Sequence, residues 1–202
     1  MASNILTATV EVQGTRPLLW HRFGPDTIPV SGKKERQGVA GNDPSEWKRS
    51  VLVTKERQLY LEPSYIFGAV RDGAKHTKRG RGTLQPMVAA TLQVNDDRVL
   101  VDRFLPEDTE AFLKHTASDP VYLDIRSVKN PATRARNVRY RVAASAGWKA
   151  QFTIIWDMTV VSRGEMEAVV RDAGMLAGLG DGRGIGFGRF RVDSFDLKTE
   201  CN

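Results

Sequence analysis

Hydrophobic and polar residues alternate in two long segments of the chain. Residues 6–12 place Leu, Ala and Val at every second position, and residues 152–160 do the same with Phe, Ile, Trp, Met and Val. A two-residue period is typical of a strand that buries one of its faces. Shorter strands are expected at 87–94 and 98–102, around an Asn-Asp-Asp turn, and a last strand over 187–197.

Two other segments have the spacing of amphipathic helices. Pro63 opens the first, where its missing N–H has no consequence, and apolar residues follow on one face through position 74. Ser162 and Glu165 have the capping-box spacing at the start of the second, which we expect to end at Gly178. A short helix is expected within 107–115, and residues 50–53 and 58–61 are expected to pair as a hairpin.

The long elements follow the order strand, helix, strand, strand, helix, strand. This order predicts an α+β fold with a ferredoxin-like or RRM-like βαββαβ core, in which two helices cover one face of a four-stranded antiparallel sheet. We expect one domain, 1–202, with insertions at about 24–62 (a loop and a short hairpin) and 103–150 (a basic arm). The Gly/Pro-rich stretch 24–45 is typical of a long mobile surface loop.

Composition excludes several classes of protein. The chain has 202 residues, of which 41% are hydrophobic, so it can bury a core. Its single cysteine, Cys201, allows neither an internal disulfide nor a Cys-rich zinc site. The first apolar stretch, 5–12, is too short for a signal peptide or a membrane span. We therefore expect a soluble cytoplasmic protein with no cofactor and no metal.

The net charge of +6 is concentrated in one segment. Residues 126–141 contain six basic residues and no acidic one, which leaves 24 of the 30 basic residues against 24 acidic ones elsewhere. Six cations on an empty surface would repel one another, and a phosphate chain would relieve that repulsion. Pro131 and the lack of helical periodicity favour an extended hairpin, and a solvated basic loop is the alternative. The six candidate phosphate contacts are Arg126, Lys129, Arg134, Arg136, Arg139 and Arg141.

Glycine occupies every second position from 178 to 188. Such a run permits positive φ and the close approach of another backbone, and its N–H groups can hold an anion. Because it follows a helix and precedes a strand, it is neither a dinucleotide fingerprint nor a P-loop. The alternative is a flexible connector. We predict nucleic-acid contacts from Gly180, Gly182, Arg183, Gly184 and Gly186.

Two smaller clusters complete the candidate residues. His21 and Arg22 lie in an aromatic-basic cluster after the first strand, and a basic cluster follows the first helix, namely Lys75, Lys78, Arg79 and Arg81. For catalysis, His21 is a weak candidate general base, and Asp26 is a weak candidate for positioning a metal or a water. No catalytic motif supports either residue, so we expect a protein that is not an enzyme.

Three of these features resemble the repeat-associated mysterious protein (RAMP) superfamily, and more narrowly the filament-forming backbone subunits of CRISPR effector complexes. The segment GLGDGRGIGFGRF, 178–190, is similar to the glycine-rich signature of that family. The segment LEPSYIFGAVRD, 61–72, resembles its first-helix motif, and the basic arm lies where backbone subunits carry a thumb hairpin. A small phage or mobile-element version would have the same features.

The resemblance implies sequence-independent binding of guide RNA by its backbone, by copies that assemble along the strand. It implies a thumb from about Tyr122 to Trp148 that reaches a neighbouring copy, phosphate contacts after the first helix, and a close approach of the strand near Gly180–Gly186. The implied partners are single-stranded RNA or DNA, with RNA favoured, further copies of the chain, and other effector-complex subunits. The alternatives are a metal-independent RNA-processing endonuclease that uses His21, a phage single-stranded-DNA-binding or recombination protein, and an interaction protein for an acidic partner.

Overall fold

An antiparallel sheet forms the body of the protein, in a computed structural model that describes residues 4–22, 44–129, 134 and 136–198. Its strands lie in the order β11-β1-β10-β7-β3, and β6 also pairs with β10. They are β1 (Ile5–Gly14), β3 (Gln58–Leu61), β6 (Gln93–Val94), β7 (Val99–Phe104), β10 (Lys149–Asp157) and β11 (Phe190–Leu197). With its helices this makes a mixed α+β protein with antiparallel sheets, as predicted.

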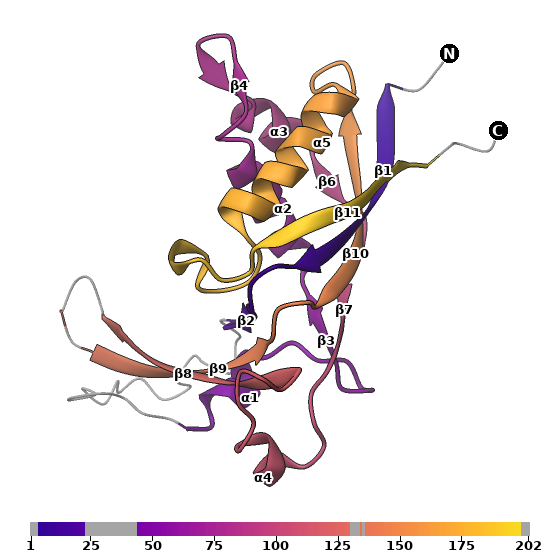
Figure 1. Cartoon of the computed structure of the whole chain (residues 1–202). Coiled ribbons are helices and arrows are strands. Elements are labelled where there is room, and N and C mark those ends of the chain that lie inside the picture. The colour runs from indigo at the N-terminus through magenta and orange to yellow at the C-terminus, as the bar shows by residue number, and fades with distance from the viewer. Residues whose placement is uncertain (1–3, 23–43, 130–133, 135, 199–202) are drawn as a thin grey trace, which may run out of the picture.

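Helices cover one face of this sheet (Figure 1). The helix α2 (Pro63–Gly73) packs against α5 (Arg163–Asp172) and against the π-helical turn Ala173–Ala177 that continues it. The helices approach closely at Gly73, where a Cβ would lie 2.5 Å from the backbone nitrogen of Ala173. Both predicted helices are therefore confirmed, and the capping box between Ser162 and Glu165 is formed.

The sheet has one buried and one open face, as the alternating pattern predicts. Val10 of β1 and Phe152 of β10 are at most 1% exposed and belong to the hydrophobic core beneath the helices. On the other face, Glu11, Asp102 and Asp193 line a shallow hollow. Lys149 also lines the hollow, so three acidic residues there outnumber one basic residue.

A second antiparallel sheet contains β2 (Leu18–Trp20), β9 (Arg136–Ala144) and β8 (Val121–Lys129), in that order. The strands β8 and β9 pair from Val121↔Ala144 to Lys129↔Arg136 and project from the body as a hairpin (Figure 1). The predicted extended hairpin is thus present. Three short elements lie beside these sheets: α1 (Glu46–Ser50), α4 (Thr109–Phe112), and a two-stranded hairpin of β4 (Lys78–Arg79) and β5 (Gly82–Thr83).

Some predicted elements are wrong. The expected strand 87–94 is mostly the helix α3 (Gln85–Thr91), which has Pro86 in its first turn and is followed by the two residues of β6. Residues 50–53 do not form a strand, because only an isolated bridge joins Val53 to Leu59. The expected short helix within 107–115, by contrast, is confirmed as the four-residue α4. The expected loop at 24–45 lies outside the described residues up to position 43.

No helix in the described ranges is both long and apolar enough to cross a bilayer.

Candidate nucleic-acid interface

The glycine loop, residues 178–188, is a folded segment. At most of its glycine positions, a positive φ or a close contact requires glycine. Gly188 has φ +68°, and a Cβ there would overlap the carbonyl oxygen of Leu179. Gly180 has φ +69°, and its Cβ would lie 2.5 Å from the carbonyl oxygen of Leu19. Gly184 differs, because its φ is not in the left-handed region and a Cβ there would meet nothing within 4 Å. No internal packing therefore requires glycine at position 184.

Most backbone amides of the glycine loop already have acceptors. Those that donate to backbone carbonyls belong to Gly178, Leu179, Asp181, Ile185, Gly186, Phe187 and Gly188. The loop therefore has fewer backbone amides available to bind an anion than its sequence predicts. Its short 3-10 turn, Arg183–Ile185, begins after Gly182, and the amides of Arg183 and Gly184 occupy first-turn positions without partners inside a helix.

A groove of about 470 Å³ lies between the glycine loop and the β8–β9 hairpin. We call it the hairpin-side groove. The hairpin contributes three arginines and Val128, the glycine loop contributes two glycines, Asp181 and Ile185, and the chain after β2 contributes a histidine: the lining includes His21, Arg126, Val128, Arg139, Arg141, Asp181, Gly182, Gly184 and Ile185. The structure thus brings together residues predicted from three separate segments of the sequence.

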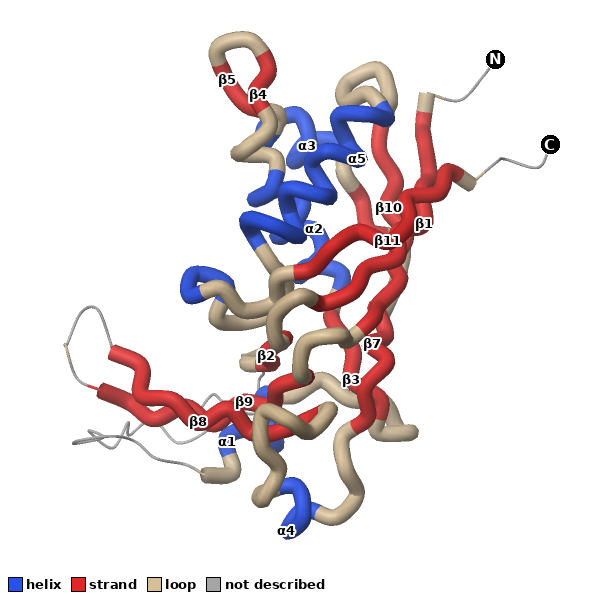
Figure 2. The backbone as a smooth tube through the Cα atoms, viewed as in Figure 1, coloured by secondary structure: helices blue, strands red, loops and turns tan. Residues whose placement is uncertain are grey.

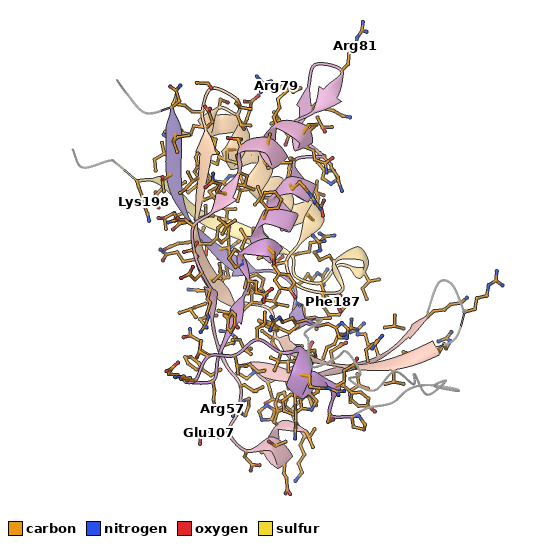
Figure 3. The ribbon with its side chains drawn as sticks, turned by 180° about the vertical axis from the view of Figure 1, so that it is seen from behind. Arg57, Arg79, Arg81, Glu107, Phe187 and Lys198 are labelled. Atoms are coloured by element: carbon orange, nitrogen blue, oxygen red, sulfur yellow. The ribbon has the colours of Figure 1, made fainter. Side chains whose placement is uncertain are left out.

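An ion network centred on the buried pair Arg141 and Asp124 fixes the base of the hairpin to the glycine loop. Arg141, whose side chain is 5% exposed, places Nη1 2.8 Å from Oδ2 of Asp181 and Nη2 3.2 Å from Oδ1 of Asp124. Arg126 pairs with the other oxygen of Asp124 at 2.6 Å and places its guanidinium 4.6 Å from the ring centre of Phe187 (labelled in Figure 3). Arg141 is therefore placed to hold the two walls together rather than to meet a ligand.

Glu46 joins a second set of predicted residues. Its Oε1 lies 3.2 Å from Nε2 of His21 and also pairs with Arg139, while Oε2 accepts a hydrogen bond from the backbone of Tyr140 at 3.2 Å. Burial raises the pKa of Glu46, but the hydrogen bonds from His21, Tyr140 and Arg139 outweigh burial, so the pKa is lower than usual. His21 and Arg139 are thus fixed by an ionised carboxylate from α1.

The far end of the hairpin carries cations of a different kind. Lys129, Arg134 and Arg136 are exposed, and within the described ranges none of them pairs with a carboxylate. We call these three residues the distal cations. The predicted repulsion along 126–141 is therefore relieved at the base of the hairpin, by carboxylates that include Glu46 and Asp181 from distant segments. It persists at the distal end.

A second hollow, of about 620 Å³, lies on the other side of the glycine loop, against the end of α2. We call it the helix-side pocket. Its charged or titratable lining residues are Asp72, Lys75, His76, Asp181, Arg183 and Arg189. Asp72 pairs with Lys75 at 2.9 Å and with Arg183 at 3.2 Å. Burial raises the pKa of Asp72, but Lys75, Arg183 and Arg71 together lower it below its usual value.

The remaining predicted residues are not part of either hollow. Lys78, Arg79 and Arg81 lie on the β4–β5 hairpin, at the opposite end of the molecule from the β8–β9 hairpin, with Arg81 at the tip (Figures 2 and 3). Arg79 donates to the carbonyl of Val160 at 2.6 Å and lies 3.8 Å from Glu165. Arg22 pairs with Glu62 at 3.1 Å. Asp26 is outside the described residues.

Sequence reasoning missed four residues of this region: Glu46, Asp124, Asp181 and Arg189. The three carboxylates partner predicted cations, yet Glu46 and Asp181 lie far from those cations in sequence, and only Asp124 is two residues from Arg126. Arg189 directly follows the last glycine of the run and is not among the predicted contacts. The one signal available in the sequence is that two arginines, Arg183 and Arg189, lie within and directly after the run of glycines.

Comparison with known proteins gives a likeness of fold. No protein-family model matches the chain, and no curated protein matches it. Among the solved structures that match is a chain of the cryo-EM structure of the Type III-B Cmr-beta bound to cognate target RNA, with a TM-score of 0.51 and 12% sequence identity. The match covers 96% of this chain and 60% of that one, so the present chain spans less than two thirds of its neighbour's length. This protein is similar in fold to a chain of that Cmr-beta structure.

Proposed function

We propose that this protein binds single-stranded nucleic acid through the phosphate backbone, independently of base sequence, in the hairpin-side groove. The observation that carries the proposal is the division of the hairpin cations. Arg141 and Arg126 are committed to the groove walls, whereas the distal cations, which follow the groove lining on the outer part of the hairpin, are exposed and unpaired within the described chain. Unpaired cations are free to replace the counterions of phosphates.

The shared fold supports RNA as the favoured strand. The structure with the similar chain contains cognate target RNA. We infer that the present chain has a RAMP-like fold with a ferredoxin-like core, in which β1, α2, β7, β10, α5 and β11 are the successive elements. The strand order β11-β1-β10-β7 and the position of both helices on one face support this inference. Binding at the hollow on the open face of the sheet would be opposed by Glu11, Asp102 and Asp193, which outnumber Lys149 there.

Assembly along the strand belongs to the same proposal. The β8–β9 hairpin projects away from the body, so its distal end is available to a neighbouring copy or to another subunit on the same strand (Figure 1). Copies that contact both the strand and each other would bind cooperatively, as is usual for proteins that coat single strands. The site of action would be the cytoplasm.

The test replaces the distal cations by Glu in one variant, Lys129→Glu, Arg134→Glu and Arg136→Glu. Binding to single-stranded RNA and DNA of mixed sequence is measured as a function of salt. We expect the wild type to bind both independently of sequence, RNA more tightly, and the variant to lose cooperativity and up to about 2 units of the slope of log affinity against log salt. The matched control changes three exposed cations elsewhere, Lys114→Glu, Arg163→Glu and Lys198→Glu.

An unchanged affinity in the distal variant would remove the hairpin from the proposal. Failure of the wild type to retard any single strand at about 50 mM salt would overturn nucleic-acid binding altogether. Tighter binding to DNA than to RNA would favour the phage single-stranded-DNA alternative.

A second candidate function is metal-independent cleavage of RNA. The observation that favours it is His21, which lines the hairpin-side groove beside Arg139 while Glu46 fixes its ring. A histidine held in this way can act as a general acid or base. Incubation of the wild type and of His21→Ala with a labelled hairpin RNA separates the two functions. We expect both proteins to leave the RNA intact, and cleavage by the wild type alone would establish the nuclease.

A further inference from the structure

Two arginines of like charge are held close together in the helix-side pocket. Nη2 of Arg189 lies 3.4 Å from the backbone carbonyl oxygen of Arg183. Nη1 of Arg189 is buried and has no hydrogen-bond partner, and no carboxylate of the described chain pairs with this guanidinium. A buried donor without a partner is destabilising, and the nearby positive charge of Arg183 adds to that.

We propose that the helix-side pocket binds a phosphate group, held between Arg183 and Arg189. This inference rests on the proposed function, because the phosphate it concerns is one of the bound strand. It adds a second binding position, on the side of the glycine loop away from the hairpin, and assigns a role to Arg189.

Phosphate suits the pocket better than a neutral ligand does. Lys75, Arg183 and Arg189 bring three permanent positive charges, and His76 lies beside them. Of the two carboxylates, Asp72 is already shared by Lys75 and Arg183, and Asp181 is engaged by Arg141 from the other side of the loop. The forked guanidinium of arginine matches two phosphate oxygens at once.

The surroundings of Arg189 also disfavour its positive charge, and a bound anion would reduce this cost. Burial, and then the charge of Arg183, lower the pKa of Arg189. An anion between the two guanidinium groups would offset both effects, since it would supply an acceptor and a compensating charge.

The glycine loop allows one nucleic-acid strand to reach both hollows. Gly182 and Gly184 line the hairpin-side groove and the helix-side pocket alike. At Gly184 a side chain would meet open space, so its absence leaves room for a backbone to cross the loop. A strand seated in the groove would thus place a neighbouring phosphate in the pocket.

The experiment compares Arg183→Gln and Arg189→Gln with the control Arg191→Gln. The side chain of Arg191 is 65% exposed and pairs with Asp193, and both residues belong to β11. Two readouts are used on the full chain. The first is the salt dependence of binding to a single-stranded RNA, with and without a 5′-phosphate. The second is the melting temperature with inorganic phosphate, against chloride at matched ionic strength.

We expect each pocket variant to lose about 0.7 units of the salt slope and about tenfold in affinity, while Arg191→Gln binds as the wild type does. We expect inorganic phosphate to raise the melting temperature of the wild type and not that of Arg189→Gln. Without ligand, Arg189→Gln should melt no lower than the wild type, because the substitution removes a repulsion. Arg189→Lys, which keeps the charge but not the fork, should retain most of the slope and lose affinity.

The outcomes distinguish the pocket from the proposed function. If the wild type binds RNA and Arg189→Gln keeps both the full salt slope and the phosphate response, the phosphate position is wrong and the groove stands. If phosphate stabilises only proteins with Arg189 but no strand binds, the pocket stands and strand binding fails. A 5′-phosphate that strengthens binding only when Arg189 is present identifies the terminal phosphate as the occupant, whereas equal loss on both RNAs identifies an internal one.

Discussion

Nη1 of Arg141 lies 2.8 Å from Oδ2 of Asp181, and this ion pair connects two segments that are 40 residues apart in the sequence. The same arginine reaches Asp124 with its other terminal nitrogen. One buried guanidinium therefore holds the hairpin and the glycine loop at a fixed separation.

The first prediction concerns that guanidinium. Replacing Arg141 by Met should lower the free energy of unfolding by about 3 kcal/mol, because the buried carboxylate of Asp124 is left with Arg126 alone. Asp181 is 40% exposed, so Asp181→Asn should cost less than about 1 kcal/mol. Urea denaturation of both variants measures the difference, and losses of equal size would contradict the buried role of Arg141.

The second prediction separates two glycines of the loop. Gly188→Ala should destabilise the protein by more than about 2 kcal/mol, because the residue has φ +68° and its Cβ would overlap the carbonyl of Leu179. Gly184→Ala should change the stability by less than about 0.5 kcal/mol, because the new methyl group meets open space. If a strand crosses the loop at Gly184, that stable variant should nevertheless bind RNA more weakly. Denaturation and RNA binding are measured on the same preparations, and wild-type affinity in Gly184→Ala would place the strand elsewhere.

The third prediction is a dependence of stability on pH. Because the pKa of Glu46 is lower in the folded protein than its ordinary value of 4.5, the carboxylate stabilises the fold above that value. This stabilisation is lost as the pH falls below about 4.5 toward the folded pKa. The Glu46→Gln variant lacks it, so the difference in unfolding free energy between wild type and variant should shrink as the pH is lowered from 6 to about 3. A constant difference over this range would show that Glu46 acts through its shape and not its charge.

The fourth prediction concerns the β4–β5 hairpin, which lies away from both hollows. Lys78→Glu with Arg81→Glu should leave binding of an oligonucleotide of about 8 residues unchanged, because such a strand fills only the loop region. Binding of a strand of about 30 residues should weaken if the nucleic acid extends to that hairpin or to the next copy. Titrations with the two lengths decide the matter, and weaker binding of the short strand would bring the β4–β5 hairpin into the site itself.

Local signals in the sequence were sufficient for most long elements. Pro63 and the capping box of Ser162 and Glu165 mark helix starts correctly, since both act within one turn. Residues 87–94 were predicted as a strand because a short apolar run has no clear period. Pro86, in the first turn of α3, was the overlooked sign of a helix.

The candidate site was only partly predictable, because its electrostatics depend on distant residues. The hairpin, the glycine loop and His21 were selected from composition and spacing. Glu46 lies 93 residues from Arg139, however, and no local pattern reveals that it neutralises part of the basic segment. The sequence also placed the cluster at 75–81 in one group, whereas the chain turns after His76 and carries Lys78, Arg79 and Arg81 away on their own hairpin.

The burial of the Arg141 network has a practical consequence for handling the protein. Salt screens exposed charges far more than buried ones. Concentrated salt should therefore release a bound nucleic-acid strand from the distal cations, while the buried ion pair of Arg141 and Asp124 persists. Nucleic acid carried through purification could then be washed away on a column, and the emptied protein could be reloaded by dilution without a refolding step.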